Sequence, residues 1–147
     1  MIFQHLNWLS VAISAIAYFA LGAIWFNQKV FGTMWMKGHN IGTVTEEDKK
    51  RMPIMMLSTL ILCFIGATAM GYFSFALNSL HPGVIEDSSV QAMKGAKLGA
   101  IAGIGFSGIG IAMNYLYTRK SFLIIAIDAS YHVIGMIITG IITSVWR

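Results

Sequence analysis

Four long apolar stretches dominate the pattern of hydrophobic and polar positions along the chain. A helix that crosses a hydrocarbon core of about 30 Å needs about 20 mostly apolar residues, and each stretch is long enough. The predicted membrane-spanning helices cover residues 8–28, 54–77, 90–117 and 122–146. We therefore expect an all-α polytopic membrane protein that forms a single membrane domain over residues 1–147.

The longest connection between these stretches is a polar loop over residues 29–52. Apolar side chains near Trp35 are expected to lie along the membrane surface. Thr45 and Asp48 have the spacing of a capping box, which predicts a short polar helix that runs into Pro53 at the start of the second span. This loop is therefore expected to be partly helical.

The third and fourth spans have clear start signals. Ser88 and Gln91 form a second capping-box pattern, which predicts that the third span begins near Val90. Arg119 and Lys120 form a tight basic turn before the fourth span. The fourth span is then expected to run from about Phe122 to Trp146.

Basic residues gather on one side of the predicted bundle, because the first and third loops of a four-span chain share a side. Those two loops carry Lys29, Lys37, Lys49, Lys50, Arg51, Arg119 and Lys120. The other side carries Lys94, Lys97 and Arg147. The positive-inside rule therefore places both termini on the non-cytoplasmic side.

Composition supports a membrane location and argues against several classes of function. Hydrophobic residues make up 56% of the 147 residues and charged residues 11%, which is more apolar surface than one soluble core of this size can bury. The net charge of +4 is expected to serve contact with anionic lipid, so nucleic-acid binding is not predicted. Cys63 has no partner within the chain, and the histidines lack the spacing of a metal motif. We predict neither a metal site nor a cofactor.

Asp128 and His132 are the most informative polar residues of the fourth span. They are four positions apart and therefore lie on one face of a helix. At 1.5 Å per residue, Asp128 lies about 9 Å and His132 about 15 Å from Phe122, which puts the histidine near the midplane. Inserting the acid costs roughly 2.5–3.5 kcal/mol, so Asp128 is expected to face protein or water.

Two interpretations of this pair stay open. In the functional one, Asp128 and His132 bind a proton or a ligand, because ionisable groups inside membranes are functional candidates. In the structural one, the two side chains bond to each other, or to Ser107 or Asn114 of the third span, and fix the register of the helices. The site candidates are therefore these four residues.

A row of small residues marks one face of the third span. Gly95, Gly99 and Gly103 follow one another at four-residue spacing. Side chains this small let two helix backbones approach closely, so the row predicts helix packing, either within the chain or between copies.

Several short motifs, taken in their order along the chain, resemble those of one known family. They are Asn7-Trp8 opening the first span, Gly22 with Trp25-Phe26 closing it, Phe31-Gly32 and Trp35-Met36 after it, Asn114-Tyr115 ending the third span, and Tyr131-His132 in the fourth. Over nearly the whole chain they resemble the small bacterial membrane proteins of domain-of-unknown-function family seventeen sixty-one. The resemblance implies four membrane-spanning helices and no settled activity. Members of that family more often carry Asn where this chain has Asp128.

Two functional hypotheses follow. The first is a homo-oligomer of the bacterial inner membrane with a polar midplane site that transports or binds a small solute or proton, since four spans are few for a complete transporter. The alternative is a non-transporting accessory subunit that binds a larger membrane complex through the glycine row and the basic first loop. An enzyme is not expected, because the polar residues are too sparse to assemble a nucleophile, a base and oxyanion donors.

Overall fold

The computed structural model describes residues 5–80 and 87–146, and every regular element in these ranges is helical. Four helical stretches are long and apolar enough to cross a membrane: Trp8–Trp25, Glu46–Ser79, Ser88–Tyr117 and Phe122–Val145. The prediction of an all-α membrane protein with four spans is confirmed.

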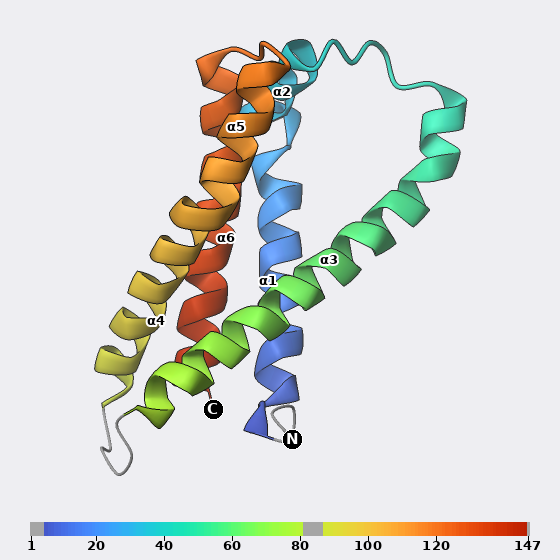
Figure 1. Ribbon diagram of the computed structural model, residues 1–147. Coiled ribbons are helices and arrows are strands. Elements are labelled where there is room, and N and C mark those ends of the chain that lie inside the picture. The colour runs from blue at the N-terminus through green and yellow to red at the C-terminus, as the bar shows by residue number, and fades with distance from the viewer. Residues whose placement is uncertain (1–4, 81–86, 147) are drawn as a thin grey trace.

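Helix α6 (Phe122–Val145) forms the centre of the bundle, as Figure 1 shows. Helix α1 (Trp8–Trp25) runs along it, and the Trp25 indole N–H donates to the Ile127 carbonyl at 3.1 Å. Helices α4 (Ser88–Ala102) and α5 (Ile109–Tyr117) cover another side of α6. The helix with both Asp128 and His132 therefore touches most of the other elements.

Helix α3 (Glu46–Ser79) is one continuous helix of 34 residues, so the polar helix after Thr45 and the second span are not separate. The predicted capping box is confirmed: Thr45 Oγ1 accepts the Asp48 N–H at 3.2 Å, and the Asp48 carboxylate accepts the Thr45 N–H at 2.9 Å. Pro53 lies inside α3 without ending it. The carbonyl of Lys49 loses its helical donor there, but this part of the helix is exposed, so another partner can replace it.

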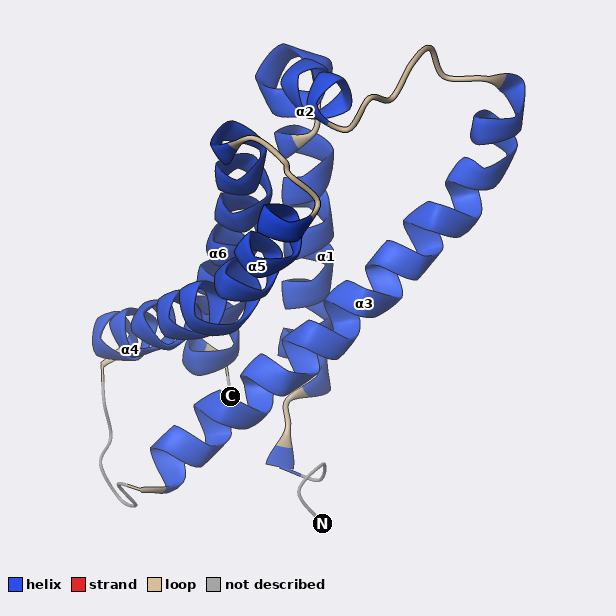
Figure 2. Cartoon of the chain, turned by 45° about the horizontal axis from the view of Figure 1, so that its top comes forward, coloured by secondary structure: helices blue, strands red, loops and turns tan. Residues whose placement is uncertain are grey.

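The two halves of α3 have different surroundings. The C-terminal half crosses α1 and α6, and the buried residues of the helix are Cys63, Ala67, Met70, Gly71 and Ser74. The N-terminal half diverges from the bundle in both views (Figure 1 and Figure 2), and residues 46–59 are exposed. A gap between α1 and α3 therefore widens toward the first loop.

Two short helical segments occupy much of the predicted polar loop. They are the π-helical turn η2 (Gln28–Gly32) and helix α2 (Thr33–Gly38), and α2 ends against α6. Phe26 packs on Trp35 with ring centroids 5.3 Å apart. A side chain at Gly32 would overlap the Phe26 carbonyl, so the chain can turn this tightly only with glycine.

The third span also differs in detail from its prediction. It begins at Ser88, close to the predicted start near Val90, but Asp87 is its N-cap, so the Ser88–Gln91 capping box is wrong. The Asp87 carboxylate accepts the Ser89 N–H at 3.0 Å and also the Ser89 hydroxyl, which supplies the cap one residue earlier. A π-helical turn η3 (Gly103–Gly108) separates α4 from α5.

The glycine row of α4 lies directly against α6. A Cβ at Gly95 would overlap the Gly140 carbonyl, and one at Gly99 would overlap the Met136 carbonyl. The row therefore packs α4 on α6 within the chain, backbone to backbone, and holds the third span beside Asp128 and His132.

Candidate functional site

Asp128 is a buried carboxylate on which three elements converge. The Tyr115 hydroxyl of α5 donates to its Oδ2 at 2.7 Å, and the Nε2 of His39, just after α2, lies 3.3 Å from the same oxygen. The His39 ring packs between Trp35 and Tyr115, with ring centroids at 4.7 Å and 5.7 Å. Asp128 itself is only 6% exposed. The site therefore joins an acid on a membrane-spanning helix to an imidazole from the first loop.

The end of α2 is tied to the turn between α5 and α6, which explains how His39 reaches Asp128. The Lys120 ammonium donates to the Gly38 carbonyl at 3.0 Å. A side chain at Gly38 would overlap that of Ile124, so Ile124 would have to move for any larger residue to fit there. These contacts place His39 directly over the first turns of α6.

His132 makes a second polar contact one helical turn further along α6. Its Nδ1 lies 2.5 Å from the Tyr18 hydroxyl of α1. The Tyr18 ring fills the notch that Gly135 leaves on α6, where a Cβ would overlap it. In the described chain, Asp128 and His132 thus bond to other helices and not to each other.

An open hollow of about 420 Å³ lies between η3, α5 and α6. Ser107, Asn114, Tyr115 and His132 are among the residues that line it. The structure therefore brings three of the four candidate residues to one surface, and Tyr115 connects that surface to Asp128.

The predicted bonds from Ser107 or Asn114 to the acid and the imidazole are not the ones found. Within residues 5–80 and 87–146, Asp128 bonds to Tyr115 and lies beside His39, while His132 bonds to Tyr18. Ser107 instead lies in the wide turn η3 and faces the hollow.

Three hydrogen-bonding partners of Asp128 and His132 were not predicted from the sequence. Tyr18 and Tyr115 had a usable signal, because a tyrosine within a membrane span needs a partner for its hydroxyl. His39 had none, because it follows the short helix α2, whose position depends on the turn at Gly32 and on the packing of Trp35.

Several side chains at this site can bind or exchange a proton. Asp128, His39 and His132 can each hold a proton, and the hydroxyls of Tyr18 and Tyr115 can donate and accept one. No group of three or more His, Cys, Asp or Glu side chains in the described ranges could hold a metal ion. The geometry offers a cluster of Asp128, His39 and Tyr115 and a separate pair of His132 and Tyr18.

Comparison with known proteins places the chain in a family. Residues 9–144 match the family described as "Protein of unknown function (DUF1761)". No curated protein and no solved structure matches the chain. The match covers nearly the whole bundle, from α1 to the last turn of α6. The chain therefore belongs to the DUF1761 family, the one its motifs resemble.

Proposed function

We propose that this protein binds protons at Asp128 and transfers them within the membrane. The observation that carries the proposal is the buried Asp128 carboxylate, held by His39 and Tyr115 on a membrane-spanning helix. A neutral side chain could fix the register of the helices at a lower free-energy cost of membrane insertion. An acid beside an imidazole adds two groups that can gain and lose a proton, which a purely structural contact does not need.

The order of the titratable groups supports a route into the membrane. His39 belongs to the first loop, Asp128 follows on α6, and His132 lies one turn further with its Tyr18 partner. A proton received at His39 can pass to Asp128 and then toward His132. The basic residues of the first and third loops favour a cytoplasmic position for the His39 end, with both termini outside, in the inner membrane of a bacterium.

Assembly as a homo-oligomer would complete the site. The hollow lined by Ser107, Asn114 and His132 is open on the outer face of the bundle, and polar groups that face lipid are costly. A second copy would cover this hollow and exclude lipid from it. To test this, Asn114→Cys in a Cys63→Ser background should form a disulfide between copies in native membranes. Exclusively monomeric protein after oxidation would contradict the assembly.

The proton proposal is tested in proteoliposomes with a pH-sensitive dye inside and a potassium diffusion potential as driving force. We expect Asp128→Asn to reduce the rate of proton entry at least tenfold. Asp87→Asn is the matched control, because it removes an exposed acid and asparagine also caps helices. Proton entry no faster than in empty liposomes, or an unchanged rate in Asp128→Asn, would overturn the proposal.

The accessory-subunit hypothesis has one supporting observation. An apolar cavity of about 340 Å³ lies between α1 and the diverging half of α3, where Phe19, Phe26, Met55 and Met56 are among its lining residues. A helix of a larger membrane complex could fill this gap. Purification in mild detergent separates the two functions: a foreign partner in fixed ratio favours the subunit, and a symmetric assembly of this chain alone favours the proton site.

A further inference from the structure

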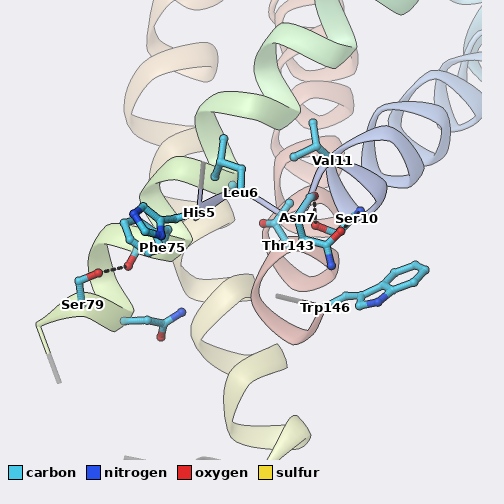
Figure 3. A pocket seen from close by; sticks show the side chains of 11 residues that line it. His5, Leu6, Asn7, Ser10, Val11, Phe75, Ser79, Thr143 and Trp146 are labelled. Carbon is cyan, nitrogen blue, oxygen red and sulfur yellow. Dashed lines mark hydrogen bonds between the residues drawn. The ribbon is translucent and has the colours of Figure 1, made fainter. Parts of the chain in front are cut away.

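Another cavity, of about 380 Å³, is shown in Figure 3. It lies at the end of the bundle where α1 begins and α6 ends, opposite helix α2 in Figure 1. The start of α1 and the ends of α3 and α6 form its walls, and His5 stacks on Phe75 there with ring centroids 5.2 Å apart. Ser10 and Thr143 also line it, although they are only 2% and 5% exposed. The cavity therefore opens at the surface and reaches buried hydroxyl groups.

Two rows of buried hydroxyl groups begin at this cavity. On α1, Ser10 is followed at four-residue spacing by Ser14 and Tyr18; on α6, Thr143 is followed in the opposite direction by Thr139. Ser14 and Thr139 are both 0% exposed. Each row therefore continues inward from the cavity on one face of its helix.

The two rows lie on helices that pack against each other. Ser10 and Thr143 line the same cavity at one end, and at the other end the Tyr18 ring fills the notch at Gly135. Since α1 and α6 run antiparallel in Figure 1, Ser14 and Thr139 occupy positions between these two levels along their helices. From Thr143 to Gly135 the helix rises by about 12 Å, and His132 is bonded to Tyr18 just beyond.

We infer that this cavity is a water-filled entrance from which protons reach His132 along the two hydroxyl rows. The identity of the transferred species rests on the proposed function, whereas water access does not. The cavity is polar enough and large enough for several waters, with the amides of Asn7 and Asn78 among its lining groups. It would connect the proton route through Asp128 to water on the side of the membrane opposite His39.

In the structure each serine and threonine hydroxyl of these rows donates to a carbonyl of its own helix, so the relay requires the hydroxyls to rotate and water molecules to bridge the gaps between them. Each oxygen then accepts one proton while it releases another. Tyr18 passes its hydroxyl proton to His132 Nδ1 and takes one from the water or hydroxyl on the cavity side. His5 is the titratable side chain among the described lining residues and is placed to take up protons from water. The row is unchanged after each transfer once the hydroxyl groups rotate back.

Packing alone is the competing explanation, because Ser and Thr hydroxyls often bond to the carbonyl four residues earlier. Thr139 donates to the Gly135 carbonyl at 2.8 Å and Thr143 donates to the Thr139 carbonyl at 2.9 Å. Thr68 on α3 makes the same kind of bond, to the Phe64 carbonyl at 2.8 Å, and does not line this cavity. Thr68 is therefore a matched control.

Water access is tested by single cysteines in a Cys63→Ser background, modified with a membrane-impermeant, positively charged methanethiosulfonate in sealed vesicles. We expect Ser10→Cys and Thr143→Cys to react at least tenfold faster than Thr68→Cys. Equal, slow modification at all three positions would overturn the entrance.

Proton passage is tested by the flux assay on Thr139→Val, which keeps the shape and removes the hydroxyl. We expect at least a tenfold loss of flux, recovery in Thr139→Ser, and an unchanged rate in Thr68→Val. If Asp128→Asn stops the flux while Thr139→Val does not, this route is wrong and the proposed function stands. If wild type moves no protons, the proposed function and the relay both fail, and thiol modification alone then decides whether water enters the cavity.

Discussion

His39 Nε2 and Asp128 Oδ2 lie 3.3 Å apart although 89 positions separate them in the chain. The contact joins the end of a short helix in the first loop to a membrane-spanning helix. The same carboxylate oxygen accepts a hydrogen bond from the Tyr115 hydroxyl. Helix α5 and the segment after α2 are therefore both attached to one oxygen atom of α6. Loss of either partner should therefore weaken the attachment of its element to α6.

Tyr115→Phe should lower the free energy of unfolding by about 0.5–3 kcal/mol, the range that covers hydrogen bonds to neutral and to charged groups. Tyr117→Phe is the control, because Tyr117 is 88% exposed and should change stability by less than about 0.5 kcal/mol. Reversible unfolding in mixed detergent micelles measures both variants. Equal losses would show that the bond to Asp128 contributes nothing specific.

Gly99→Ala should destabilise the bundle, because the new methyl group would overlap the Met136 carbonyl. Forcing extra atoms into a packed interior costs about 1–3 kcal/mol. Gly110→Ala is the matched control: nothing lies within 4 Å of its Cβ position, so alanine should be neutral or stabilise the helix by up to about 1 kcal/mol. The same unfolding assay compares them, and a tolerated Gly99→Ala would mean that α4 and α6 pack less closely than described.

The sequence predicted those structural features that depend on residues close together in the chain. The four spans follow from apolar length, and the cap at Thr45 follows from the acid three positions later. The Ser88–Gln91 pattern misled because Asp87, one residue earlier, is a competing cap. Where two caps compete, spacing alone does not decide between them.

The partners of Asp128 could not be predicted in the same way. The position of His39 depends on the tight turn at Gly32, on the Lys120 bond to Gly38 and on the close contact of Gly38 with Ile124. Each of these contacts joins residues whose proximity exists only after folding. The sequence showed that the acid needed partners, while the fold decided which ones.

The N-cap of α4 makes a pH-dependent contribution. The pKa of Asp87 lies below its usual range because the Ser89 hydroxyl and N–H donate to the carboxylate. Because folding lowers this pKa, the charged carboxylate stabilises the folded state at pH values above the usual pKa of an aspartate. This contribution is lost as the pH falls through the lowered pKa. A carboxyl ¹³C titration should show the low pKa in wild type, a higher one in Ser89→Ala and little change in Ser88→Ala. An equal pKa in wild type and Ser89→Ala would exclude the Ser89 hydroxyl as its cause.

Gly135→Ala should separate Tyr18 from His132, because the added methyl group would occupy the space of the Tyr18 ring. Tyr18 must then move, and its hydroxyl loses the imidazole nitrogen that lies 2.5 Å away. The ¹⁵N chemical shift of His132 Nδ1 reports this loss, and Tyr18→Phe should produce a similar shift. Gly66→Ala is the control, since its Cβ would make only an ordinary contact, 3.9 Å from the terminal methyl of Met136. A wild-type His132 spectrum in Gly135→Ala would show that the Tyr18 ring does not fill this notch, and the route from the cavity to His132 would lose its last link.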